Sequence, residues 1–161
     1  MSVGLVLTGK TKGERYQSLL PQIRVLIEDE TDLVAASAII SSALAMAFKW
    51  WWAGFYIVKE HQLVLGPFQG PIACARIAWG KGVCGTAWKE NKTLIVPNVE
   101  EFPGHIACST LSRSEIAVPI RNGEGLVAGV LDVDSEYIDC FDDTDAKYLE
   151  EIACLLSRFF E

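Results

Sequence analysis

The sequence has 161 residues, of which 50% are hydrophobic and 22% charged, the composition of a folded globular chain rather than a disordered one. The net charge is −7 and Lys and Arg form no dense run, which excludes nucleic acid and anionic membrane surfaces as expected partners. No stretch reaches the roughly 18 apolar residues of a membrane span, and the apolar run from Val3 to Leu7 is too short for a signal peptide, so we expect one cytoplasmic domain over residues 1–161.

Two helices are predicted near the start of the chain. The first covers about Lys12 to Ile27, where apolar residues recur at helical spacing, and Pro21 inside it predicts a kink or a restart. The second begins near Asp32, a residue type that caps helix N-termini, and runs to about Phe48. Its small apolar residues indicate that this helix is buried.

The rest of the chain predicts an antiparallel sheet closed by a last helix. The expected strands are Trp51 to Lys59, Leu63 to Pro67, Thr93 to Val96, Glu115 to Arg121 and Leu126 to Asp134. A short helix is expected at Val83 to Glu90, and a closing helix from Asp142 to about Phe160. We predict an α+β fold in which the N- and C-terminal helices cover one face of the sheet. Two glycine- and proline-rich loops, Gly66 to Gly82 and Asn98 to Ser112, enclose a pocket on the other face.

Three of the five cysteines lie in or beside these two loops: Cys74, Cys84 and Cys108. Loops held by a rigid scaffold are where function concentrates, and thiols in a reducing compartment are usually catalytic, metal-binding or inert. With His105 they also allow a zinc site, although none of them forms the close pair typical of zinc ligands. Redox chemistry is favoured over zinc binding and over inert buried thiols. We interpret Cys140, in a turn, and Cys154, in the apolar stripe of the closing helix, as structural.

Three carboxylates are predicted to lie close to the Cys108 loop. Asp132 and Asp134 are two residues apart in one strand and therefore share a face, and Glu115 begins a neighbouring strand just after that loop. Carboxylates held together repel, which raises the pKa of at least one of them. A protonated carboxyl group can act as a general acid, and an ionised one can hold a substrate ammonium. The alternative interpretation is a solvated strand end.

An aromatic strand gives a third candidate feature of the site. Alternation predicts Trp50, Trp52, Gly54 and Tyr56 on one face and Trp51, Ala53, Phe55 and Ile57 on the other. One face must pack on the helices, and the other can form a wall of the pocket. Taken alone, the pattern fits equally well with both faces lying in the core.

The sequence resembles the GAF-domain free methionine-(R)-sulfoxide reductases over essentially its whole length. The resemblance rests on the segments WWAGFYIV, PIACARIAWGKGVCGTAW, HIACSTLSRSEIAVPI, GVLDVDS and FDDTDAKYLEEIA, which occur in this order. The spacing of the three cysteines is the specific part, because ordinary GAF sensor domains lack it.

This resemblance implies a GAF-like fold, reduction of free L-methionine (R)-sulfoxide, and a role for each candidate residue. Cys108 is the implied nucleophile, Cys74 the main resolving cysteine and Cys84 a secondary thiol. The implied substrate-binding residues are Glu115, Asp132, Asp134, Trp52 and Tyr56. The sulfenic acid formed on Cys108 condenses with Cys74 to a disulfide, which thioredoxin reduces. No metal or organic cofactor is implied.

Two other classes of function remain open. One is a non-catalytic GAF sensor of a small molecule or of redox state, although no output domain is expected after the final helix and three acids suit a phosphate ligand poorly. The other is a zinc-binding interaction module. The terminal helices leave a homodimer open as well. Glycines at 66, 70, 80 and 82 supply permissive backbone, so we expect the Cys74 segment to move with redox state.

Overall fold

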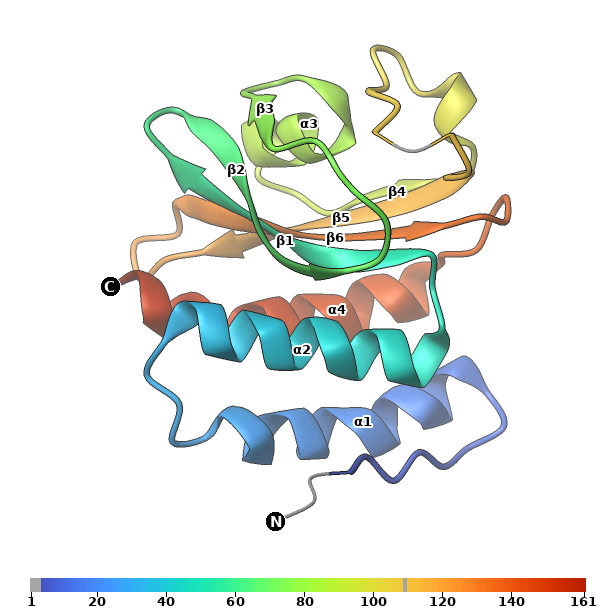
Figure 1. Ribbon diagram of the computed structural model, residues 1–161, viewed down its shortest axis with the longest axis vertical. Coiled ribbons are helices and arrows are strands. Elements are labelled where there is room, and N and C mark those ends of the chain that lie inside the picture. The colour runs from blue at the N-terminus through green and yellow to red at the C-terminus, as the bar shows by residue number, and fades with distance from the viewer. Residues whose placement is uncertain (1–3, 109) are drawn as a thin grey trace.

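Three of the helices lie together on one side of the sheet in the computed structural model, which describes residues 4–108 and 110–161. They are α1 (Lys12–Ile27), α2 (Leu33–Phe48) and α4 (Asp143–Leu155). α2 and α4 pack against the sheet, and α1 packs against α2 and α4 as an outer layer (Figure 1). α1 continues through Pro21, so it does not restart there. Asp32 caps α2 as predicted, accepting a hydrogen bond from the Ala35 amide. None of the helices in the described residues is long and apolar enough to cross a membrane.

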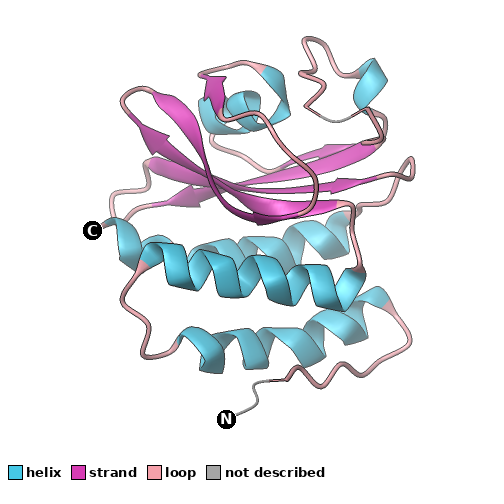
Figure 2. Ribbon diagram, in the orientation of Figure 1, coloured by secondary structure: helices cyan, strands magenta, loops and turns pink. Residues whose placement is uncertain are grey.

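The sheet has six strands in the order β3-β2-β1-β6-β5-β4, and every neighbouring pair is antiparallel. The strands are β1 (Trp52–Lys59), β2 (Gln62–Gln69), β3 (Arg76–Ala78), β4 (Leu94–Val96), β5 (Ser114–Arg121) and β6 (Val127–Ser135). The short helix α3 (Gly82–Glu90) and the long loops lie on the side opposite to α2 and α4 (Figure 2). The predicted α+β fold, with helices on one face of an antiparallel sheet and loops around a pocket on the other, is confirmed.

The largest differences from the predicted elements concern β2, β3 and the closing helix. β2 extends to Gln69, and β3 lies inside the segment expected to be a loop, because Ile77 is buried and pairs with Leu63. A strand of three residues is too short for its alternation to be read from sequence. The closing helix ends at Leu155 and is followed by a 3-10 turn, Ser157–Phe160, in which Arg158 donates hydrogen bonds to the end of α1.

Cys154 does not lie in the buried stripe of α4. The buried positions of α4 are Asp145, Tyr148, Leu149, Ile152 and Ala153, and the Cys154 side chain is exposed. These buried positions and Leu156 follow regular i, i+3, i+4 helical spacing, and residue 154 lies outside that pattern. The interpretation of Cys154 as a small core residue is therefore wrong.

The start of β1 also corrects the predicted faces. Ala53, Phe55 and Ile57 belong to the core between sheet and helices, whereas Trp52 and Tyr56 belong to the core on the pocket side. Trp50 precedes the strand, and its ring stacks on Phe48 at 4.3 Å on the helical side. Trp51 lines the pocket. Strand alternation does not extend to residues 50 and 51, so their predicted faces are exchanged.

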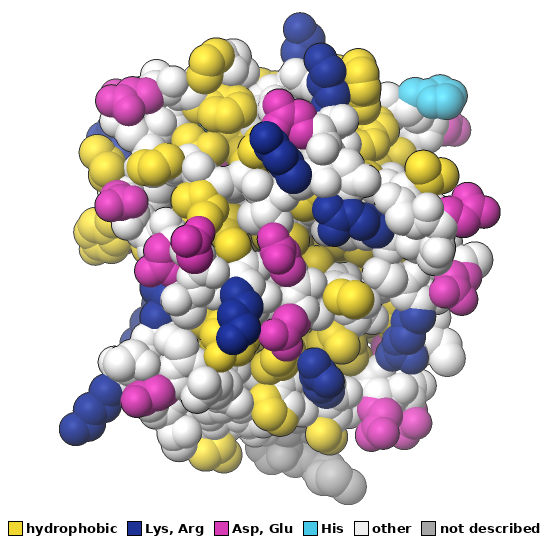
Figure 3. Space-filling model, turned by 180° about the vertical axis from the view of Figure 1, so that it is seen from behind, with side chains coloured by type: hydrophobic (Ala, Val, Ile, Leu, Met, Phe, Trp, Pro, Cys, Tyr) yellow, Lys and Arg dark blue, Asp and Glu magenta, His cyan; other side chains and the backbone are white. Residues whose placement is uncertain are grey.

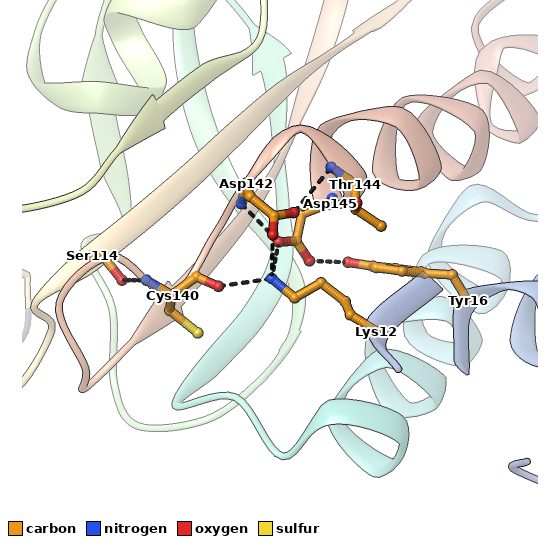
Figure 4. Close-up of polar contacts among 7 residues, drawn as sticks. All are labelled: Lys12, Tyr16, Ser114, Cys140, Asp142, Thr144 and Asp145. Carbon is orange, nitrogen blue, oxygen red and sulfur yellow. Dashed lines mark hydrogen bonds and ion pairs between the residues drawn. The ribbon is translucent and has the colours of Figure 1, made fainter. Parts of the chain in front are cut away.

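A buried polar cluster joins α1 to α4 (Figure 4). Asp145 is fully buried at the start of α4 and accepts hydrogen bonds of 2.6 Å from both Lys12 Nζ and the Tyr16 hydroxyl. The Lys12 ammonium also donates to the Cys140 carbonyl at 3.0 Å. Burial lowers the pKa of Lys12, but Asp145 and Asp142 outweigh this effect and leave that pKa raised. The acidic first turn of α4 thus holds the outer helix in place, besides complementing the helix dipole.

On the face shown in Figure 3, Lys and Arg side chains are interspersed with Asp and Glu. This face therefore presents mixed charge, unlike the concentrated basic surface that binds a phosphate backbone.

Candidate active site

Three neighbouring strands place two acids and an aromatic residue in one row. Glu115 of β5 is directly opposite Asp134 of β6, and Asp134 is directly opposite Trp52 of β1. Residues directly opposite each other on antiparallel strands project to the same face of the sheet. Asp132 is two residues from Asp134 and shares that face. The register therefore brings the three predicted carboxylates together beside Trp52.

Small residues on both sides of Asp132 leave space above the sheet. Its cross-strand partners are Gly54 on β1 and Ala117 on β5. A Cβ atom at Gly54 would lie 2.8 Å from the Trp52 indole and collide with Phe68. Glycine at this position lets the Trp52 and Phe68 rings stack at 5.2 Å over the sheet. The stacked aromatic rings of the pocket wall therefore require glycine at position 54.

A disulfide joins Cys74 to Cys108, which lines the pocket. The two residues are 34 positions apart, and their Cα atoms lie 5.4 Å apart. Both side chains are half-buried. The pairing is the one expected for the oxidised chain, and it leaves Cys84 as a free thiol inside the pocket.

The predicted pocket aromatics also hold the Cys74 segment. Trp52 Nε1 donates to the carbonyl oxygen of Pro71 at 3.2 Å, and the Tyr56 hydroxyl donates to that of Cys74 at 2.9 Å. Burial, followed by the nearby acids and the Cys84 thiol, raises the pKa of Tyr56, so its hydroxyl remains a donor. The two aromatic side chains therefore form the wall of the pocket and fix the backbone of one disulfide partner.

Cys84 lies on α3 and faces the acids. Its thiol donates to Glu115 Oε1 at 3.6 Å, and its sulfur lies within 4.8 Å of carboxylate oxygens of both Glu115 and Asp132. Cys84, Glu115 and Asp132 are 3%, 6% and 5% exposed, respectively. Burial raises the pKa of Cys84 well above its ordinary value, and the charges of Asp132 and Glu115 raise it further. This thiol is therefore protonated at neutral pH.

Desolvation dominates the electrostatics of the carboxylates. Burial raises the pKa of each of Glu115, Asp132 and Asp134, and repulsion from Asp132 adds to the shift for the other two. A hydrogen bond of 3.0 Å from the Ser112 hydroxyl partly offsets the shift of Asp134. His105 Nε2 lies 4.0 Å from Glu115, but burial lowers the pKa of His105, so it supplies little positive charge at neutral pH. Without a ligand the buried acids therefore tend to hold their protons, and a cationic ligand group beside them would favour ionisation of a carboxyl group.

These groups surround a cavity of about 50 Å³. Seven of the eight predicted site residues line it: Trp52, Tyr56, Cys84, Cys108, Glu115, Asp132 and Asp134. Cys74, the eighth, is bonded to Cys108. The structure thus brings the predicted set together, and the role of each residue remains a prediction.

The lining also contains residues that sequence reasoning missed or used differently. His105, which the sequence suggests only as a zinc ligand, and Ser112, which it places only at the end of a loop, both line the pocket. Ile72, Ile77 and Ile106 complete the apolar part of the wall. The available signal was their place in the two long loops, since these loops fold over the sheet face that carries the acids.

The fold and this pocket define a GAF domain. A family model described as "GAF domain" matches residues 30–161, and the chain belongs to this family. The chain is 53% identical to "GAF domain-containing protein A" of Dictyostelium discoideum, covering 98% of this chain and 100% of the relative.

Some similar proteins are named for an enzymatic activity, and they define a narrower group within the GAF family. The chain is 41% identical to a "Free methionine-R-sulfoxide reductase" of Saccharomyces cerevisiae, over 91% of this chain and 86% of the relative. A crystal structure of the free methionine-R-sulfoxide reductase of Neisseria meningitidis, in complex with its substrate, superposes with a TM-score of 0.94. It is 49% identical to this chain and covers 98% of it and 95% of its own length. Within the GAF family, the chain therefore groups with the free methionine-R-sulfoxide reductases.

Proposed function

We propose that this protein reduces free L-methionine (R)-sulfoxide to methionine, with Cys108 as the nucleophile. The observation that carries the proposal is the Cys74–Cys108 disulfide at the edge of a pocket lined by three acids and Trp52. A reversible disulfide needs two thiols that can meet, and a sulfoxide needs a proton donor beside the attacking thiol. The similarity to the reductases named above supports the same chemistry.

The catalytic cycle has three stages: reduction of the sulfoxide, formation of the disulfide, and reduction of the disulfide. The Cys108 thiolate attacks the sulfoxide sulfur while a protonated carboxyl group donates to its oxygen. The new bond between the two sulfur atoms then breaks, methionine leaves, and the hydroxyl group passes from the substrate sulfur to Cys108 as a sulfenic acid, so the sulfoxide is reduced and the cysteine oxidised by two electrons. The Cys74 thiol displaces this oxygen as water and forms the disulfide. An external dithiol returns both cysteines to thiols by exchange.

The pocket chemistry explains a preference for the free amino acid. The α-ammonium of free methionine sulfoxide can pair with an ionised carboxylate of the Glu115, Asp132 and Asp134 group, and its methyl group can pack on the Trp52 indole. In a peptide or an N-acylated substrate this nitrogen is an uncharged amide, so the ionic contact is lost. Repulsion between neighbouring carboxylates raises the pKa of at least one of them. One acid can therefore stay protonated and act as the proton donor while another is ionised.

With the disulfide formed, the cavity of about 50 Å³ holds only a few water molecules. A sulfoxide therefore needs a wider pocket, which we infer is opened by reduction of the Cys74–Cys108 bond and displacement of the Cys74 segment. Both cysteines are half-buried, so a protein dithiol such as thioredoxin can reach the bond. We place this cycle in the cytoplasm, where a reducing pool sustains it.

A homodimer is supported by apolar side chains exposed on helices α1 and α2. Val25, Val34 and Met46 are 70%, 63% and 55% exposed on α1 and α2. Sedimentation analysis of the reduced protein tests this point, with a monomer at micromolar concentration as the contradicting result.

A thioredoxin-coupled assay tests the recycling and the selectivity together. Thioredoxin, its reductase and NADPH are combined with the free (R)-epimer, the free (S)-epimer or the N-acetylated (R)-epimer. We expect sustained NADPH oxidation with the free (R)-epimer and little with the other two. Equal rates with free and N-acetylated substrate contradict the ammonium contact, and turnover that glutathione but not thioredoxin sustains contradicts the proposed reductant.

A further inference from the structure

We propose that Cys84, Glu115 and Asp132 form a zinc-binding site at the base of the pocket, through which Zn²⁺ inhibits the enzyme. Among the described residues, each of these three offers one potential ligand atom, and the three atoms lie within 4.8 Å of one another. The site differs from the one that sequence spacing raised, because Cys74 and Cys108 are joined to each other and the cysteine that remains is Cys84.

The distances suit a tetrahedral ion. With Zn–S near 2.3 Å and Zn–O near 2.1 Å, neighbouring sulfur and oxygen ligands lie roughly 3.6 Å apart. The separation between Cys84 Sγ and Glu115 Oε1 is 3.6 Å. All three ligand atoms lie within 4.8 Å of one another, so bringing the Asp132 oxygen into place takes a shift of roughly 1 Å.

One buried oxygen of the Asp132 carboxyl group, Oδ1, has no hydrogen-bond partner among the described residues. The whole residue is only 5% exposed. A buried polar atom without a partner is costly, and a buried carboxylate more so. A divalent ion held by Cys84, Glu115 and Asp132 would give the Asp132 carboxylate a partner and would displace the protons that the buried thiol and acids hold in its absence.

The donor atoms select zinc over the hard cations. Magnesium and calcium take oxygen ligands, whereas a thiolate among carboxylates suits zinc. His105 also lines the pocket, and its Nε2 atom lies 4.0 Å from Glu115 Oε2, outside the three-residue group, so it is a neighbouring nitrogen donor rather than a member of the site. The structural pattern is thus one sulfur, two oxygens and a neighbouring imidazole.

Zinc at this site removes Glu115 and Asp132 from contact with the substrate. Inhibition should therefore be competitive with methionine sulfoxide and reversed by a chelator. The inhibition rests on the proposed function, whereas metal binding itself does not.

Binding is tested with Co²⁺ as a spectroscopic probe on a protein in which Cys84 is the sole cysteine. Cys74, Cys108, Cys140 and Cys154 are replaced by Ser, and Co²⁺ is titrated anaerobically while thiolate-to-cobalt charge-transfer absorption is recorded. We expect one Co²⁺ per chain, displaced by one equivalent of Zn²⁺. Glu115→Gln and Asp132→Asn should each weaken binding at least tenfold, whereas Glu101→Gln, an exposed carboxylate in a 3-10 turn, should not.

A second measurement covers the case in which the multiple variant folds poorly. Zn²⁺ should raise the Tm of the reduced wild-type protein, and Cys84→Ser should remove most of this rise. Absence of both the charge-transfer band and the Tm shift overturns the site, as does binding that Glu115→Gln and Asp132→Asn leave unchanged. Metal binding by a protein that reduces no sulfoxide would refute the proposed function and leave the metal site standing. Sulfoxide reduction that saturating Zn²⁺ does not slow would refute the proposed inhibition and leave the proposed function standing.

Discussion

The Tyr56 hydroxyl donates a hydrogen bond of 2.9 Å to the carbonyl oxygen of Cys74, so a residue of the pocket wall also holds one partner of the disulfide. Tyr56→Phe keeps the ring and removes this bond. We expect faster amide hydrogen exchange in the segment around Cys74, and disulfide formation after a single turnover slowed several-fold, because the resolving thiol is less well positioned. Hydrogen exchange and quenched-flow alkylation measure the two effects. Unchanged exchange and unchanged closure would show that the hydroxyl does not position this segment.

Replacing each of the two disulfide cysteines by serine should block a different step of the reaction. Cys108→Ser should abolish reduction of the sulfoxide, because no thiolate attacks it. Cys74→Ser should release about one methionine per chain and then stall as a sulfenic acid, since only resolution is lost. Methionine released per chain before any reductant is added distinguishes the two variants. Sustained activity in Cys108→Ser would end the assignment of the nucleophile.

Replacing any of the three pocket acids by its amide should lower the activity. Glu115→Gln, Asp132→Asn and Asp134→Asn should each lower kcat/KM, by about 10²–10⁴-fold for the residue that donates the proton. The acid that mainly binds the ammonium should act more through KM. If all three amides keep near-normal kcat/KM, the substrate binds elsewhere.

The same raised pKa values predict how stability depends on pH. Folded Glu115 retains a proton that the unfolded chain releases above its ordinary pKa of 4.5. Stability therefore falls as pH rises from that value through the raised pKa of the folded state. Glu115→Gln removes this loss, so its Tm should exceed that of the wild type by more at pH 8 than at pH 5. A wild-type Tm advantage that grows with pH would show that Glu115 is ionised and stabilised in the fold.

The Lys12, Tyr16 and Asp145 cluster between α1 and α4 should contribute to the stability of the fold and leave kcat/KM unchanged. Asp145→Asn weakens the contacts to Lys12 and Tyr16 at a fully buried position, at a cost of about 2–4 kcal/mol. For a chain of this size the Tm should fall by roughly 5–15 °C. Asp143→Asn, an exposed neighbour in the same turn, serves as the control and should change Tm by less than a third as much. A loss of kcat/KM in folded Asp145→Asn protein would contradict the separation of this cluster from the site.

The acids could be placed from sequence because strand periodicity is strict. Once Asp132 and Asp134 lay in one strand and Glu115 in its neighbour, alternation fixed the face they share, and the register then fixed their proximity. The resemblance supplied the roles and the expected pairing of Cys74 with Cys108.

Other features depend on contacts between distant segments. Trp50 and Trp51 exchange faces because β1 begins only at Trp52, a boundary set by pairing with Asp134. β3 exists because Ile77 pairs with Leu63 across the sheet edge. The proximity of Cys84 to Glu115 and Asp132 depends on how α3 packs over β5 and β6, which no local pattern encodes.

The most direct test of the proposed function is a single turnover without any recycling system. Fully reduced protein is mixed anaerobically with an equal concentration of racemic free methionine sulfoxide, the two epimers are quantified by chiral chromatography, and the disulfide is located by peptide mapping. We predict loss of the (R)-epimer alone, in proportion to the appearance of the Cys74–Cys108 bond. Persistence of both epimers beside reduced cysteines, or equal consumption of the two, would contradict the proposed function.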